Sequence, residues 1–283
     1  VVIRQPEMLP KLSQGVTTVI VGNCGISASP VSLRSDPPDP MNLLGSAAAF
    51  VYPRFSDYRS AVESAHPAVN VAALIGHTAL RSNHMDDLHR TATAAEIAAM
   101  RVQLHESLEA GALGLSTGLA YASAFNAETD EVLQLSEELT AFGAVYTTHL
   151  RSEFEPVLEA MEEAFSIGRH SRSPVIISHL KCAGAGNWGR SPQLLAALES
   201  AAKTHPVGCD CYPYAASSST LDLKQVTDAF RITITWSTAH PEMGGRDLQA
   251  IAAEWDVSLM DAARRLQPAG AVYYGMDEAD VRR

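Results

Sequence analysis

The stretch AVYTTHLRSEFEPVLEAMEEAFSIGRHSRSPVIISH, residues 144–179, carries the pattern that decides the fold. Two short apolar runs, 144–149 and 174–179, each end on a histidine and have the composition of buried strands. The residues between them predict a helix over 153–169, because apolar side chains recur there at the spacing of one helical face: Phe154, Val157, Leu158, Met161 and Phe165. A strand, a helix and a second strand in succession favour parallel neighbours, and hence an α/β fold.

The same alternation extends along the chain. Further strands are predicted at 17–23, 70–76, 112–117 and 207–211, and a second amphipathic helix at 94–110. Ser152 and Glu155 have the spacing of a capping box at the start of the 153–169 helix. Strand starts near 144, 174 and 207 are 30 and 33 residues apart, the length of a βα unit, so a TIM-like (β/α)8 barrel is expected. A doubly wound open sheet is the main alternative.

Composition limits the classes of function. The 283 residues are 46% hydrophobic, which is enough for one large core, and we expect one partial barrel domain over 1–283. A net charge of -11 disfavours nucleic acid as a partner, and no apolar run approaches the length of a membrane span. Four cysteines are too few for a disulfide scaffold, which favours a reduced, cytoplasmic setting.

Both ends read as internal sequence. The chain opens VVIRQPEMLPKL, without an initiator Met, and closes MDEADVRR, which resembles a helix that continues. Six predicted strands are two fewer than a complete barrel needs. The chain is therefore expected to be an internal fragment that lacks the first and last barrel strands.

Three residues at predicted strand ends have the chemistry of metal ligands. Cys24 follows the run TTVIVGN, and His149 and His179 end two neighbouring strands. Thiolate and imidazole together suit zinc, and strand ends on one face of a barrel are where chemistry is placed. The plainer alternative is a buried thiol between two turn glycines and two packed histidines.

Two motifs suggest other chemistry. GLSTG, residues 114–118, fits the nucleophile elbow with Ser116 as nucleophile, but the elbow needs a helix at once and the next helix is expected near Thr129. GAGNWG, residues 184–189, fits a dinucleotide-binding loop, but HLKCA separates it from the preceding strand. A glycine-flanked strand end and a loop before a helix at 191–203 are the simpler interpretations.

Basic residues after the strand ends could bind a substrate carboxylate. Lys181 lies two residues beyond His179, and an ammonium group there could pair with a carboxylate. Lys224 and Arg231 follow on a later loop, where a plain surface role is equally consistent with the sequence.

Several segments in the same order resemble the N-acyl-D-amino-acid deacylases of the amidohydrolase superfamily. They are GVTTVIVGNCGIS, GLSTGLAY, THLRSE, ISHLKCAGAGNWGRS and DCYPYAASSSTL, and the resemblance covers nearly the whole chain. ITWSTAHPE and the short 221–231 link are similar to the N-acyl-D-glutamate deacylase branch.

The resemblance implies a metal site and a carboxylate site. It implies a TIM-like barrel with one or two zinc ions, for which Cys24, His149 and His179 match the metal ligands. Lys181 and Tyr214 match residues that contact the substrate carboxylate, with Ser218 or Ser219 adding a hydroxyl. An H-x-H pair before Val1, an S-D-G aspartate (the general acid and base) beyond Arg283, and a small β-sandwich are expected outside the chain.

The expected function is zinc-dependent hydrolysis of the amide bond of N-acyl-D-amino acids, small-molecule substrates. Another metal-dependent amidohydrolase, dihydropyrimidinase-like or dipeptidase-like, is the alternative on the same fold. A NAD-dependent oxidoreductase using GAGNWG and a non-catalytic barrel are the alternatives of other classes. Acyl chain, D-side-chain preference and oligomeric state stay open.

Overall fold

The computed structural model describes all residues from 1 to 283 and divides them into two compact units. Unit 1 comprises residues 1–152, 156–180 and 197–210, and unit 2 comprises 153–155, 181–196 and 211–283. The single barrel domain expected over 1–283 stays a prediction. Each unit is described by itself.

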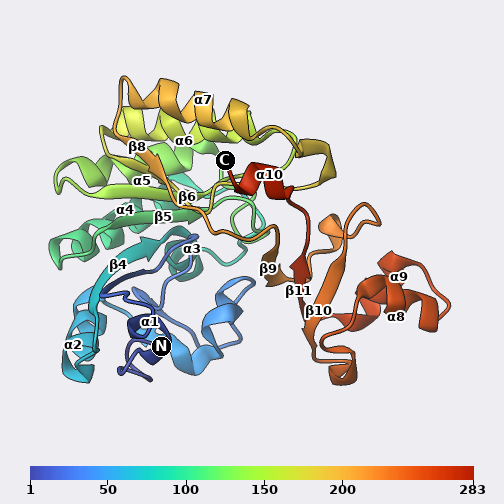
Figure 1. Cartoon of the computed structure of the whole chain (residues 1–283). Helices are drawn as coiled ribbons and strands as arrows, with labels where there is room; N and C mark the ends of the chain where they lie inside the picture. Colours follow the sequence, from blue (N-terminus) through green and yellow to red (C-terminus); the bar gives the residue numbers. More distant parts are fainter. The chain divides into compact units, whose positions relative to one another are not determined.

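Unit 1 is built on a parallel sheet of six strands (Figure 1). All six predicted strands are confirmed: β1 Thr18–Val21, β4 Asn70–Gly76, β5 Gly114–Gly118, β6 Val145–His149, β7 Val175–Ile177 and β8 Val207–Cys209. They pair in the order β1-β4-β5-β6-β7-β8, which is their order along the chain. A doubly wound sheet reverses its strand order, so the sequential order excludes it and confirms a TIM-like half-barrel.

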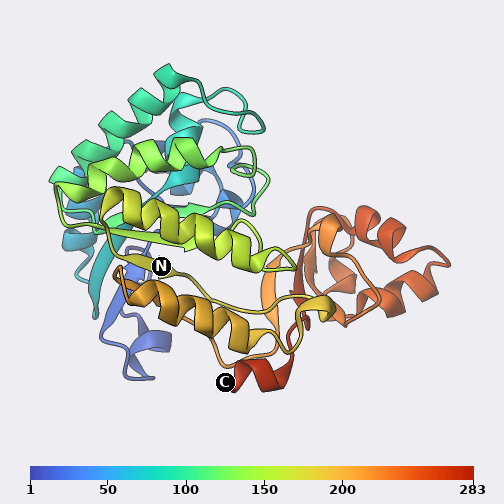
Figure 2. The same cartoon turned by 90° about the horizontal axis from the view of Figure 1, so that it is seen from above.

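The helices of unit 1 precede its parallel strands or connect them. They are α1 Leu9–Leu12, α2 Phe55–Ala65, α3 His77–His84, α4 Ala94–Glu109, α5 Thr129–Thr140 and α6 Val157–Ser171. Seen from above, α4, α5 and α6 lie in a row along one side of the sheet (Figure 2). The helix predicted at 94–110 is confirmed as α4, and Thr93 and Glu96 form a reciprocal capping box at its start.

The start of α6 corrects the sequence prediction. The helix expected over 153–169 begins at Val157, and Pro156 occupies its N-cap without a side-chain hydrogen bond, so the predicted Ser152–Glu155 capping box does not form. The Glu153 carbonyl instead accepts a hydrogen bond of 2.9 Å from the Ala183 amide. A contact remote in sequence therefore holds residues 153–155 out of the helix.

The Pro-rich segment between β1 and β4 folds into short elements. They are β2 Val31–Ser32, the 3-10 turns η1 Met41–Leu44 and η2 Ala47–Ala49, and β3 Val51–Tyr52. The two strands pair antiparallel. Val31, Met41, Phe50 and Ala79 form a buried apolar cluster that anchors the segment against α3.

Unit 2 contains a sheet that the sequence did not reveal. Strands β9 Ser217–Thr220, β10 Ile232–Ser237 and β11 Ala269–Tyr273 pair antiparallel in the order β10-β11-β9. Helices α8 Leu248–Glu254 and α9 Leu259–Leu266 complete its apolar core. The remaining elements of the chain are η3 Ala185–Asn187, α7 Ser191–Ala202, η4 Leu223–Gln225, η5 Pro241–Met243 and α10 Glu278–Val281.

The helices of the chain do not have the dimensions of membrane spans: none combines the length and the apolar character that crossing a bilayer requires.

Candidate metal centre

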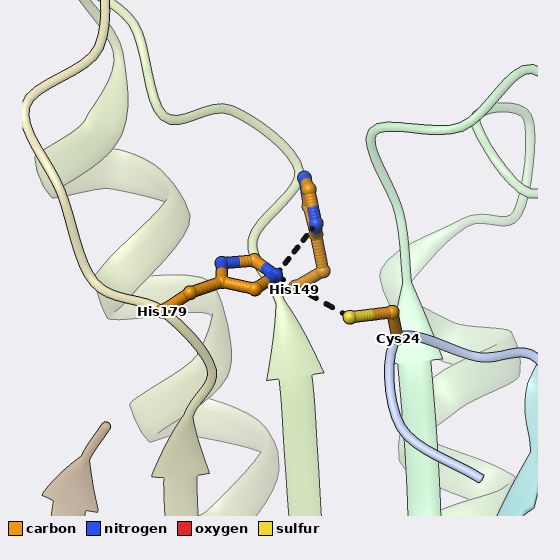
Figure 3. Close-up of side chains that lie close together, drawn as sticks. All are labelled: Cys24, His149 and His179. Carbon is orange, nitrogen blue, oxygen red and sulfur yellow. Dashed lines mark hydrogen bonds between the residues drawn. The ribbon is translucent and has the colours of Figure 1, made fainter. Parts of the chain in front are cut away.

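Three predicted ligand residues meet in unit 1 (Figure 3). Nε2 of His179 lies 3.3 Å from Sγ of Cys24 and 3.1 Å from Nδ1 of His149. One ligand atom from each residue falls within 4.8 Å of the other two, and all three side chains are half-buried. The structure therefore brings together the thiol and the two imidazoles that were predicted from the sequence as metal ligands.

The two histidines are placed by neighbouring strands. His149 is the last residue of β6, and His179 follows the end of β7 by two residues. Thr148 of β6 pairs with Ile177 of β7, so the two strands end at the same level. Parallel pairing thereby sets both imidazoles on the carboxyl-end edge of the sheet.

Cys24 reaches the histidines although β1 lies three strands from β6 in the sheet. A flat sheet would separate these strands by roughly 14 Å. The turn after β1 bends over the strand ends, where the Gly25 carbonyl accepts a 2.9 Å hydrogen bond from the Thr78 amide. A Cβ on Gly118 would lie 2.3 Å from the Cys24 carbonyl oxygen, so only glycine at the end of β5 lets the turn approach this closely.

Ser116 supports the Cys24 turn and lacks the setting of a nucleophile. Its side chain is fully buried, donates a 2.5 Å hydrogen bond to the Gly22 carbonyl and accepts one of 3.0 Å from the Gly25 amide. The next helix, α5, begins at Thr129. The nucleophile-elbow interpretation is wrong for this chain, because an elbow serine is exposed and opens a helix.

The donor set suits zinc. Ligand atoms around one tetrahedral zinc ion, with zinc–nitrogen bonds of about 2.0 Å and zinc–sulfur bonds of about 2.3 Å, lie about 3.3–3.6 Å apart. The two separations measured from Nε2 of His179, 3.1 and 3.3 Å, are close to that spacing. Three protein ligands leave a fourth position for water or substrate, as in catalytic zinc sites.

Tyr121 borders the cluster and was not nominated from the sequence. Its hydroxyl lies 3.3 Å from Nδ1 of His149, and the two rings are 4.8 Å apart between centroids. The residue belongs to the GLSTGLAY segment, which was the only signal available in the sequence. The Tyr121 ring shields one side of the His149 imidazole.

Lys181, in unit 2, lies against a carboxylate and an aromatic ring. Its ammonium is 2.5 Å from Oε1 of Glu153 and 5.6 Å from the centroid of the Tyr212 ring, and the lysine side chain is 7% exposed. Burial, and next the Glu153 charge, raise the pKa of the Tyr212 phenol above its usual range. The buried lysine therefore already has one anionic partner.

The other predicted carboxylate-binding residues also lie in unit 2. Tyr214 is 66% exposed, and its ring centroid is 6.4 Å from that of Tyr212. Ser218 and Ser219 are on β9, opposite β11, and Lys224 is on η4. The Arg231 guanidinium stacks 3.6 Å over the Tyr274 ring.

The GAGNWG segment forms a turn that is capped from within unit 2. Residues 185–187 make η3, and α7 begins at Ser191. The Asp280 carboxylate accepts hydrogen bonds from the Gly189 amide, the Ser191 amide and the Ser191 hydroxyl, at 2.6, 3.2 and 2.6 Å. A dinucleotide pyrophosphate would need these donors, so the internal carboxylate opposes the dinucleotide interpretation.

Comparison with known sequences finds the same family along the whole chain. A family model described as the amidohydrolase family matches residues 2–282. Three enzymes of Alcaligenes xylosoxydans xylosoxydans cover 99% of the chain: a D-aminoacylase (46% identical), an N-acyl-D-aspartate deacylase (48%) and an N-acyl-D-glutamate deacylase (43%). The chain spans 58%, 56% and 57% of their respective lengths.

Solved structures agree with the sequence comparison. A D-aminoacylase structure, described by its binuclear metal center with one-metal activation and second-metal attenuation, is 46% identical and matches with a TM-score of 0.95. An N-acyl-D-glutamate deacylase from Bordetella bronchiseptica, complexed with zinc and a phosphonate mimic of the tetrahedral intermediate, is 41% identical with a TM-score of 0.94. Each match covers 100% of this chain and 59% of the other.

Proposed function

Because the chain belongs to the amidohydrolase family, we propose that the protein hydrolyses the amide bond of N-acyl-D-amino acids at a zinc site held by Cys24, His149 and His179. The observation that carries the proposal is the meeting of these three ligand atoms within 4.8 Å. The chain spans less than two thirds of its relatives, so the activity is proposed for the natural protein that contains it.

Each ligand residue has a distinct task. The Cys24 thiolate supplies the soft, anionic donor, and the two imidazoles supply neutral nitrogen donors, so the set keeps one net negative charge toward a divalent cation. Zinc bound there would act as a Lewis acid toward the acyl carbonyl and provide a nucleophile for hydrolysis at neutral pH. A single ion is proposed for this cluster.

The carboxylate of the substrate is proposed to bind near Lys181. Its ammonium is paired with Glu153 and lies over Tyr212, so a substrate carboxylate would share or replace an existing ionic partner. Tyr212 joins the sequence-based candidates because of its place beside Lys181. Tyr214, Ser218, Ser219, Lys224 and Arg231 remain proposed contacts for the same group.

The proposed substrate class is N-acyl-D-amino acids, and no particular side chain of the D-amino acid is proposed. The identities to the D-aminoacylase, the aspartate enzyme and the glutamate enzyme, 46%, 48% and 43%, are too similar to select the acidic branch that ITWSTAHPE suggested. A cytoplasmic location is proposed with the function, because a thiolate ligand requires Cys24 to stay reduced.

The test measures loss of each substrate and formation of its hydrolysis product by the natural, zinc-loaded protein. N-acetyl derivatives of D-methionine, D-aspartate and D-glutamate are compared with their L enantiomers, a dihydropyrimidine and a dipeptide. Release of D-amino acid without turnover of the other compounds supports the proposal. Turnover of the cyclic amide or the dipeptide alone, binding of NAD without zinc, or no reaction with any D compound overturns it.

A further inference from the structure

We propose that Asn23 is a positioning residue that aligns all three metal-ligating side chains, an inference that rests on the proposed zinc site. Asn23 immediately precedes Cys24 in the turn after β1. Its side-chain oxygen accepts two hydrogen bonds, of 3.0 Å from the Thr147 hydroxyl and 3.1 Å from the Ser178 hydroxyl. A carboxamide oxygen has two lone pairs, so both acceptor positions are used.

The two donors stand beside the two histidines. Thr147 lies two residues before His149 on β6, so both side chains project from the same face of that strand. Ser178 directly precedes His179. One oxygen atom of Asn23 therefore joins the segments that carry Cys24, His149 and His179.

The hydrogen bonds of Asn23 also restrain two residues with unusual backbone conformations. Cys24 and His179 both have left-handed backbone conformations, with φ of 55° and 41°. Such conformations are strained for residues other than glycine and persist where the surroundings over-determine them. The residue before each of them, Asn23 or Ser178, is one end of the 3.1 Å hydrogen bond, which restrains both strained residues at once.

Two other contacts in the region each restrain a single ligand segment. Ser116 hydrogen-bonds the Gly22 carbonyl and the Gly25 amide, on either side of Asn23 and Cys24, and the Asp210 carboxylate accepts a 2.7 Å hydrogen bond from the His179 amide. The Ser178 amide donates a 2.9 Å hydrogen bond to the Thr148 carbonyl and so joins the two histidine segments to each other, whereas Asn23 joins the Cys24 turn to both. Asn23 thus sets the relative placement of the ligands, which decides how closely the donor set matches the short bonds that zinc requires.

The two hydroxyl groups that donate to Asn23 are buried, which determines the expected effect of substitutions. Thr147 and Ser178 are 6% and 1% exposed, so loss of the Asn23 oxygen leaves two buried hydroxyls without that acceptor. Asn23→Leu removes the acceptor and keeps the number of side-chain heavy atoms, whereas Asn23→Asp keeps an oxygen that can accept both hydrogen bonds. Thr147→Val with Ser178→Ala removes the same two bonds from the other side.

The experiment measures zinc affinity of the full chain by competition with a chromophoric chelator, and the thiolate-to-metal charge-transfer band after cobalt substitution. Asn23→Leu is expected to weaken zinc binding by about 10–100-fold and to change the cobalt band. Asn23→Asp is expected to bind within about threefold of the unsubstituted chain or more tightly. The Thr147→Val/Ser178→Ala variant should match Asn23→Leu, and combining all three changes should add little.

Asn83→Leu is the matched control. Asn83 is also a half-buried carboxamide in unit 1 with two hydrogen bonds, to the Pro30 carbonyl and the Gln103 side chain, but neither partner adjoins a ligand. It should lower the urea midpoint of the metal-free chain and leave zinc affinity unchanged. Equal zinc loss in Asn23→Leu and Asn83→Leu, or zinc affinity within twofold in Asn23→Leu, overturns the proposal.

The outcome for Cys24→Ala separates this proposal from the zinc site itself. If Cys24→Ala leaves zinc affinity unchanged, the proposed metal site fails and the role of Asn23 fails with it. If Cys24→Ala abolishes binding and Asn23→Leu has no effect, only the role of Asn23 fails.

Discussion

Nη1 of Arg81 donates hydrogen bonds of 2.6 and 2.7 Å to the two carboxylate oxygens of Glu131, and both side chains are fully buried. The second guanidinium nitrogen of Arg81 donates to the Leu88 and Arg90 carbonyls. Nε2 of His77, the first residue of α3, lies 2.7 Å from the same carboxylate. This charged cluster joins α3 and α5. Removal of one member is therefore expected to lower the free energy of unfolding.

Arg81→Met is expected to lower the free energy of unfolding by about 3–5 kcal/mol, because it leaves the Glu131 charge buried with one partner fewer. Urea unfolding followed by circular dichroism measures the change. Arg54→Met is the control, since Arg54 forms an exposed ion pair with Asp57 and its loss should lower stability far less than the loss of Arg81. Equal losses of unfolding free energy in the two variants would show that the buried ion pair stabilises the fold no more than an exposed one.

Acid should destabilise unit 1 through Glu131. Burial alone would raise the pKa of this carboxyl, but the hydrogen bond and charge of His77 and the charge of Arg81 outweigh it and lower the pKa to about 2. Since the folded pKa is below the unfolded value of about 4.3, the stabilisation is present above pH 4.3 and is lost as pH falls toward 2. The loss is of the order of 3 kcal/mol.

The measurement is the urea midpoint between pH 6 and pH 3, with Glu131→Gln as comparison. The variant is less stable at pH 6, and its midpoint should fall less steeply with acid than that of the unsubstituted chain. Parallel pH profiles for the two proteins would show that Glu131 is not the responsible group.

Ser116→Ala should loosen the Cys24 turn. The substitution leaves the buried Gly25 amide and the Gly22 carbonyl without their shared partner, which costs about 1–3 kcal/mol of unfolding free energy. Zinc affinity should fall with it. Ser123→Ala is a matched control, because the Ser123 hydroxyl is buried and has no hydrogen-bond partner, so its removal should be neutral or stabilising. A Ser116→Ala variant with unchanged stability and zinc affinity would show that Ser116 does not hold the Cys24 turn.

Gly22→Ala should be far more damaging than Gly15→Ala. Both glycines have left-handed backbones, with φ of 84° and 80°, but a Cβ on Gly22 would lie 2.2 Å from the Leu74 carbonyl oxygen and one on Gly15 would meet nothing within 4 Å. The conformation alone costs about 1–2 kcal/mol, which we expect for Gly15→Ala, and the clash should raise the loss for Gly22→Ala above about 3 kcal/mol. Equal thermal midpoints of the two variants would contradict the close packing of Gly22 against the Leu74 carbonyl.

Much of the fold could be predicted because its signals are local. Each strand of the half-barrel is a short apolar run bounded by turn residues, and Cys24, His149 and His179 stand out because they end or follow such runs. The repeat of about 30 residues then places two of them on neighbouring strands. Parallel pairing brings the two histidines together, and Cys24 joins them within 4.8 Å because the turn after β1 bends over the strand ends.

The features that sequence reasoning missed depend on distant contacts. The start of α6 is set by the bond between Glu153 and Ala183, which no local pattern records. Strand β9 consists of SSST, which lacks the alternation of a half-buried strand, and it forms only because β11 pairs with it. The link from Asn23 to Thr147 and Ser178 spans 124 and 155 residues, beyond the reach of any periodicity.

Zinc titration of the full chain and its Cys24→Ala variant tests whether Cys24 and the two histidines hold one zinc ion. We expect one bound equivalent in the unsubstituted chain and a loss of affinity of at least about 100-fold in the variant, more than the loss of an outer hydrogen-bond partner causes. Cys211→Ala, at an exposed position, should bind zinc as the unsubstituted chain does. Unchanged zinc affinity in Cys24→Ala would show that Cys24 is not a ligand.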